Sequence, residues 1–246
     1  MNDIRQFADA AEEIYLFSIS AAWDQHRRYP HLSLQECFAK RTMLWSFLHL
    51  IREESHPLRL KLLDHIRRAQ SPSEMKNHIP TIRQYAADHM KTLLEPPPEY
   101  PDGASVHCVR LANPGWGYLH FYNGKRPHSF LDFPRDFAAE LLKKLEDCES
   151  ILGCKTIYTA TWLNELPRFL YFFPEEWIAN MSPPTAPEEI LPTNGFQGQF
   201  YNAAGFLNRK TADYLLKNGV LKYRRRESHC SIDSMREHLR GILAGS

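Results

Sequence analysis

The run KTIYTATWLNELPRFLYFFPEEW, residues 155–177, joins a β-like segment to an aromatic segment through a Trp-Leu-Asn turn. Residues 155–162 are rich in β-branched and aromatic side chains, which favours a strand. The preceding residues 134–153 begin with proline, end in glycine and carry apolar side chains at helical spacing. With an alternating run at residues 116–122 before them, this order predicts a strand–helix–strand unit whose two strands are parallel.

Further strands and helices flank this unit in the sequence. Residues 105–112 alternate like a strand and reach the next one through an Asn-Pro-Gly turn. Towards the C-terminus we expect a strand pair at 197–207 broken at Gly205, a helix at 209–217, a strand at 223–231 and a helix at 232–243. The C-terminal region therefore predicts a mixed sheet with helices.

The first part of the chain has a different pattern. Apolar side chains recur at helical spacing through residues 1–95, which predicts four or five helices. Ser33 stands three residues before Glu36, a capping box that predicts a helix running to about Arg52. Pro57 fits a helix boundary.

A proline-rich stretch, EPPPEYPDG, separates the two regions. Consecutive prolines fix an extended backbone and do not continue a helix. We therefore expect an α+β fold. A helical region, residues 1–95, leads through a connection at 96–103 into a mixed α/β region, residues 104–246, and packs on it.

Composition restricts the functional class. The 246 residues include 30 Lys and Arg against 29 Asp and Glu, a net charge of +1, so a dedicated nucleic-acid partner is not expected. No run approaches the roughly 18 apolar residues that span a bilayer, and the first residues do not read as a secretory signal. Five scattered cysteines without a CxxC pair favour reduced thiols, and we expect a cytoplasmic protein without a membrane partner.

The common catalytic and metal motifs are absent from the sequence. One E-x-x-H occurs, at residues 53–56, where a di-metal helical site needs two, so no metal is expected. The chain has no G-x-S-x-G elbow and neither glycine-rich phosphate-binding fingerprint.

A small-molecule site is predicted where the strand at 155–162 ends, because ligands of α/β proteins bind outside the carboxyl ends of strands. Asn164 and Arg168 lie four residues apart in an otherwise apolar segment and need polar partners, so we expect them to point together beside Trp162. Three further candidates for the same cleft are Trp116, Tyr118 and Gln199.

A basic turn follows the strand at 116–122. Lys125, Arg126 and His128 precede a predicted helix, whose N-terminus favours anions, so they are candidates for holding a phosphate or carboxylate. A solvated basic turn is the alternative interpretation.

Two resemblances rest on the same segment. The pattern TWLN, LPRFL and FPEEW, followed by GQF, resembles an uncharacterised family of bacterial soluble proteins. Asn164 and Tyr171 are spaced as in a strand–helix junction of the GCN5-related N-acetyltransferase superfamily, with Pro167 at the place of a small residue. This similarity implies a coenzyme A thioester as donor and Tyr171 as the general acid.

Two functions follow as hypotheses. The first is an enzyme that acts on a small molecule, with acyl transfer from coenzyme A to an amine as its concrete form. His120 or Glu165 would be the base, and the basic turn would hold the donor's phosphates. The alternative is a non-catalytic ligand-binding or protein-interaction module, which needs only an apolar surface with a few placed polar groups.

Overall fold

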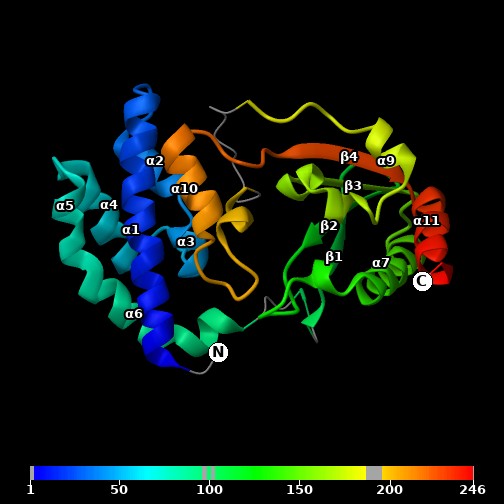
Figure 1. Ribbon diagram of the computed structural model, residues 1–246, viewed down its shortest axis with the longest axis horizontal. Helices are drawn as coiled ribbons and strands as arrows, with labels where there is room; N and C mark the ends of the chain where they lie inside the picture. Colours follow the sequence, from blue (N-terminus) through cyan, green and yellow to red (C-terminus); the bar gives the residue numbers. More distant parts are fainter. Residues whose placement is uncertain (1–2, 96–98, 101–102, 187–195, 246) are drawn as a thin grey trace. The chain divides into compact units, whose positions relative to one another are not determined.

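The computed structural model describes residues 3–95, 99–100, 103–186 and 196–245. The predicted α+β class is confirmed, because the chain combines many helices with one four-stranded mixed sheet (Figure 1). Two compact units are present. Unit 1 contains the described residues of 1–95, 187–202 and 206–222, and unit 2 contains those of 96–186, 203–205 and 223–246. Residues 206–222, grouped with the mixed region in the sequence analysis, thus belong to unit 1. Most of the expected connection at 96–103 lies outside the described residues.

Unit 1 is helical. Its elements are α1 (Ile4–Arg28), α2 (Leu34–Lys40), α3 (Leu44–Phe47), α4 (Pro57–Arg68), α5 (Pro72–Met75), η1 (Lys76–His78), α6 (Ile79–Leu94), η5 (Gln197–Phe200) and α10 (Arg209–Asn218). Pro57 begins α4, as expected for a residue whose missing N–H has no intrahelical role there.

The long helix α1 organises unit 1. Asp3 caps it by accepting from the Arg5 amide at 2.9 Å, and its buried face includes Ile14, Tyr15 and Phe17. Helices α6 and α2 pack along it, and the Phe17 ring lies 5.1 Å from that of Phe200. This contact ties η5, which is far away in the sequence, to the core of unit 1.

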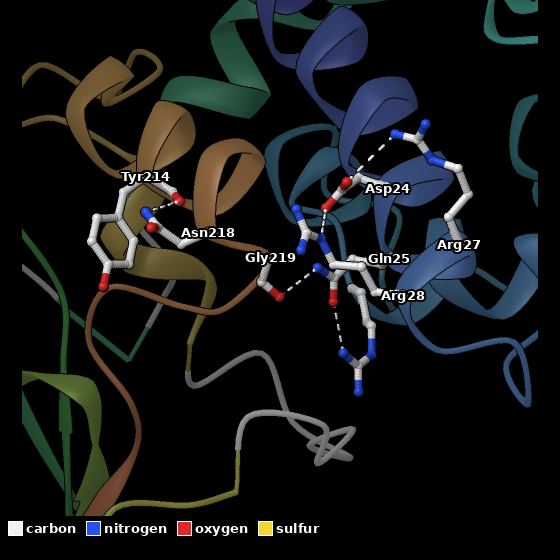
Figure 2. Close-up of polar contacts among 8 residues, drawn as sticks. Asp24, Gln25, Arg27, Arg28, Tyr214, Asn218 and Gly219 are labelled. Atoms are coloured by element: carbon white, nitrogen blue, oxygen red, sulfur yellow. Dashed lines mark hydrogen bonds and ion pairs between the residues drawn. The ribbon is translucent and has the colours of Figure 1, made fainter.

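The end of α1 meets the end of α10 in a polar network (Figure 2). The Gln25 amide donates to the Gly219 carbonyl at 3.0 Å, and Arg28 pairs with Asp24 at 2.7 Å. Gly219 has a φ of +73°, the left-handed conformation that ends α10. Buried Asp24 and Gln25 are therefore structural groups.

Two expectations for unit 1 were wrong. The capping box of Ser33 and Glu36 is present, but α2 ends at Lys40 instead of continuing to Arg52, and the Thr42 hydroxyl donates to the Phe38 carbonyl at 2.7 Å. Residues 197–207 contain the short helix η5 and a single bridge between Tyr201 and Leu207 in place of a strand pair.

Unit 2 is built on a sheet of β1 (Val106–Arg110), β2 (Trp116–Phe121), β3 (Thr156–Thr161) and β4 (Arg226–Ser231) in that order. The β2–β3 pair is parallel, and the two outer pairs are antiparallel. The predicted strand–helix–strand unit is thus confirmed. Its crossover helix is α7 (Pro134–Ser150), and Gly153, with a φ of +66°, follows the helix.

Helices cover one face of this sheet. Helix α7 and the C-terminal helix α11 (Ile232–Ala244) lie side by side against it (Figure 1). The strand residues that share their apolar core form what we call the helical face: Val106, Cys108, Leu119, Ile157 and Cys230.

Short helices follow β3. They are η4 (Trp162–Glu165), α8 (Pro167–Leu170) and α9 (Glu175–Ala179), and η3 (Phe130–Asp132) precedes α7. Phe169, Phe172 and Trp177 from this segment are buried, and Phe172 packs edge-on against Phe137 of α7 at 4.9 Å. The aromatic segment therefore extends the core on the helical side.

Candidate functional site

The opposite face of the sheet carries aromatic rings and histidines. Because side chains alternate along a strand, Trp116, Tyr118 and His120 point away from buried Gly117 and Leu119. Tyr158 of β3 and His229 of β4 join them on this side. We call these five residues the aromatic face.

The five rings form a continuous chain across three strands. His229 lies 5.1 Å from Trp116, Trp116 lies 6.4 Å from Tyr158, and Tyr158 lies 5.3 Å from Tyr118, measured between ring centroids. Tyr118 and His120 are 4.2 Å apart at an interplanar angle of 34°. The other three ring pairs are tilted or edge-on, with interplanar angles of 43° to 68°, so neighbouring strands present a continuous row of inclined rings in unit 2.

A carboxylate lies beside this chain of rings. Burial, and after it the neighbouring Glu227 carboxylate, raises the pKa of Tyr158 to about 12. Arg225 pairs with the same carboxylate at 3.1 Å. The phenol therefore stays protonated at neutral pH, and Glu227 is held in place with acceptor capacity left on its oxygens.

The other end of the aromatic face reaches solvent. His120 is exposed, and so is Val109 of β1 on the same side of the sheet. Partial desolvation, together with nearby His107, lowers the pKa of His120. At neutral pH the imidazole is consequently uncharged, with one nitrogen that donates and one that accepts.

Asn164 and Arg168 do not point together. Asn164 is fully buried: its amide donates to the Arg226 carbonyl at 2.9 Å, and its carbonyl accepts from the Trp177 indole at 3.2 Å. Arg168 is exposed and binds Asp132 at 2.8 Å. The expectation that the two side chains point together was wrong, because they have different partners within the fold.

Two neighbours of Asn164 also have structural contacts. Glu165 accepts from the backbone amide of Arg224 at 2.8 Å. The Trp162 ring packs on Tyr223 with 5.8 Å between centroids.

Tyr171 lies on the helical side of the sheet. It is 54% exposed, its ring contacts Phe172, and its backbone carbonyl accepts from His238 of α11 at 2.9 Å. His120 is on the opposite side of the sheet, so Tyr171, the general acid implied by the acetyltransferase resemblance, is not brought together with His120, one of the two candidate bases.

The three side chains of the basic turn do not gather at one point. Arg126 lies over the Tyr122 ring at 5.3 Å, whereas the exposed His128 ring packs edge-on against Phe133 at 5.9 Å. Lys125 is half-buried, and its backbone carbonyl accepts from the His128 amide. Arg126 and His128 thus pack on different rings.

Gln199 belongs to unit 1, whereas the residues of the aromatic face belong to unit 2. Its side chain is buried and donates to the Phe196 carbonyl at 3.0 Å, while its backbone carbonyl accepts from Thr211 at 2.7 Å. Gln199 therefore fixes η5 against α10.

Sequence reasoning missed three residues of this region: Tyr158, Glu227 and His229. Their signal was the alternation within residues 155–162 and 223–231, which places every second side chain on one face. The pattern does not contain the register of the three strands. In the structure Tyr158 lies opposite His229, and Tyr118 lies opposite Tyr158.

Two features are absent from the residues that the structure describes. None of their helices is long and apolar enough to cross a membrane. They also hold no group of three or more His, Cys, Asp or Glu side chains arranged to bind a metal ion.

Comparisons with known proteins found no relative of this chain. No family model matches the chain, and no curated protein or solved structure shows significant similarity to it.

Proposed function

We propose that the protein binds a small molecule with a flat ring on the aromatic face of unit 2. The observation that carries this proposal is the continuous chain of rings from His229 through Trp116, Tyr158 and Tyr118 to His120. A planar ligand gains dispersion and electrostatic stabilisation by stacking on such rings, and each aromatic contact contributes about 0.5–1.5 kcal/mol beyond its burial.

The polar groups at this face suggest the chemistry of the ligand. Glu227 offers carboxylate oxygens beside Tyr158, and neutral His120 offers one donor and one acceptor. A ring with an N–H or amino donor near one edge, such as a heteroaromatic base, would satisfy both the stacking and the hydrogen-bonding groups.

Binding without chemistry is favoured over acyl transfer. General acid–base catalysis requires both groups within hydrogen-bond reach of one substrate. Tyr171 bonds His238 of α11 through its backbone carbonyl, His120 belongs to the aromatic face, and Glu165 accepts from a backbone amide. The aromatic face needs none of these roles to hold a ligand.

The test is ligand-detected NMR on the full chain with a panel of flat rings, including adenosine, nicotinamide, indole and riboflavin. We expect at least one compound to bind, and Tyr118→Ala to weaken that binding by about 1–3 kcal/mol, as for single stacking residues elsewhere. Tyr171→Ala is the matched control, since it removes an exposed aromatic ring from the helical side. Equal weakening by both variants, or no binding by any compound, would contradict the proposal.

A further inference from the structure

Two histidines lie opposite each other where the aromatic face reaches β1. His107 of β1 is the partner of His120 of β2 in the register of the sheet. Val106 and Cys108, the neighbours of His107, belong to the helical face, so His107 points to the same side of the sheet as His120. The proposed stacking of a flat ring does not use His107.

The hydrogen bonds of this strand pair set the distance between the two histidines. The Tyr122 amide donates to the Ser105 carbonyl at 3.0 Å, two residues along each strand from His120 and His107. His107 and His120 are therefore also a hydrogen-bonded pair, and the Cα atoms of such pairs are about 5.5 Å apart. Side chains at this spacing can contact one small group together.

Each imidazole packs on an aromatic neighbour of its own. The His120 ring lies 4.2 Å from the Tyr118 ring, and the His107 ring packs edge-on against Tyr100 at 5.9 Å. No hydrogen bond joins either imidazole to another of the residues that the structure describes. The nitrogens of both rings are thus left for a ligand.

A cation lies at the same end of the aromatic face. Arg126 is placed over the Tyr122 ring at 5.3 Å, and Tyr122 lies 5.1 Å from Tyr100, the ring that packs on His107. A Cβ on Gly205 would lie 3.0 Å from the Arg126 guanidinium, so this glycine leaves room for it. Arg126 forms no ion pair with an acidic side chain in the described part of the chain.

The charges around His120 make its protonation sensitive to a ligand. Burial and the neighbouring His107 lower the pKa of His120, and Glu99, which precedes β1, raises it by less. An oxyanion between the two rings would favour the imidazolium form of both, because an opposite charge within about 4–6 Å stabilises it. Glu99 repels such an anion but also stabilises the imidazolium. Binding of an anion should therefore take up protons.

A metal ion suits this pair of histidines less well. A bound metal ion usually has three or four protein ligands. Among the described residues, no third His, Cys, Asp or Glu completes a metal-binding arrangement with His107 and His120, and the nearby Arg126 is positively charged. Imidazolium and guanidinium groups instead match the oxygens of an anion through charge-assisted hydrogen bonds.

We infer that the flat ligand of the aromatic face carries an oxyanion, a carboxylate or a phosphate, which binds between His107 and His120. This inference rests on the proposed stacking on the aromatic face. Tyr118 connects the two ends of the site, since its ring lies 5.3 Å from that of Tyr158 and 4.2 Å from that of His120. A ring stacked on Tyr118 can thus turn its donor edge towards Glu227 and its acidic substituent towards the histidines.

The experiment compares compounds that share a ring and differ in the charged group, by isothermal titration calorimetry on the full chain. The pairs are nicotinamide with nicotinate, indole with indole-3-carboxylate, and adenosine with adenosine monophosphate. At pH 6 we expect the anionic member to bind about tenfold more tightly, as one charge-assisted hydrogen bond provides. A carboxylate keeps its charge between pH 6 and pH 8, whereas the imidazolium forms are lost, so this advantage should shrink as the pH rises.

Variants make the assignment specific. His107→Gln should lose most of the advantage of the anion and keep the affinity for the uncharged ring, because His107 is not one of the stacking rings. His128→Gln removes an exposed histidine of the same unit and should keep the advantage. Titrations in two buffers of different ionisation enthalpy should show proton uptake when the anionic compound binds to the wild type.

The outcomes separate this inference from the stacking proposal. Equal affinity of the charged and uncharged compounds at pH 6, or an advantage that His107→Gln retains, would overturn the oxyanion site and leave the stacking proposal standing. Binding of no compound would overturn both. The wild-type comparison is decisive even if a variant folds poorly.

Discussion

Replacing Asn164 by leucine should strongly destabilise unit 2, because this side chain joins three elements in the core. Its amide donates to the Arg226 carbonyl of β4, and its carbonyl accepts from the Trp177 indole of α9. Leucine fills a similar volume but satisfies neither group. Each buried polar group left unpaired costs about 1–3 kcal/mol, so for these two groups we expect a loss of roughly 2–6 kcal/mol in the free energy of unfolding of unit 2.

The assay should report on unit 2 alone. Amide hydrogen exchange of β3 and β4 measures the free energy of opening for that sheet, whatever unit 1 does. Arg168→Ala is the control, because Arg168 is exposed and its pair with Asp132 should contribute at most about 1 kcal/mol. A loss below about 1 kcal/mol in Asn164→Leu, or an equal loss in both variants, would refute the structural role of Asn164.

Two further predictions concern unit 1. Burial, together with His65, lowers the pKa of His78, so the fold favours neutral His78, and stability should fall as pH drops below its unfolded value of about 6.5. Urea unfolding of unit 1 between pH 7.5 and 5.5 should show this loss of stability. The loss should be smaller in His78→Gln, whereas His89→Gln, which replaces an exposed histidine, should lose as much as the wild type. Gly219→Ala should cost about 1–2 kcal/mol for the left-handed backbone, plus the displacement of Arg28, which a Cβ would overlap. In an Arg28→Ala background only the backbone cost should remain, and equal costs in both backgrounds would contradict the overlap.

Much of the secondary structure of unit 2 could be predicted from local patterns. Pro134 and Gly153 bracket α7, and the alternation of Trp116, Tyr118 and His120 placed all three on one face. These signals are local because helix caps and strand periodicity depend on residues that are close in sequence.

The candidate site was harder to predict because its partners are distant in sequence. Asn164 and Arg168 needed polar partners, as expected, but the partners are Arg226, Trp177 and Asp132, from elements that the sequence pattern does not align. Asn164 is buried and its hydrogen bonds hold the fold together, whereas Arg168 is exposed and forms an ion pair with Asp132. A polar residue in an apolar segment therefore predicts a partner without saying whether that partner is a ligand.

Unit 1 shows the same limit. The contact of Phe17 with Phe200 and the bond from Gln25 to Gly219 join segments nearly 200 residues apart, so the membership of residues 206–222 in unit 1 has no local signal. The capping box at Ser33 gave the start of α2 correctly but not its end.

The most direct test of the binding proposal is a crystal of the full chain soaked with a mixture of flat ring fragments. The proposal predicts ring density stacked on Trp116, Tyr118 or Tyr158, with a donor edge turned towards Glu227. Density for bound rings only elsewhere on the chain, with the aromatic face empty at saturating concentration, would contradict it.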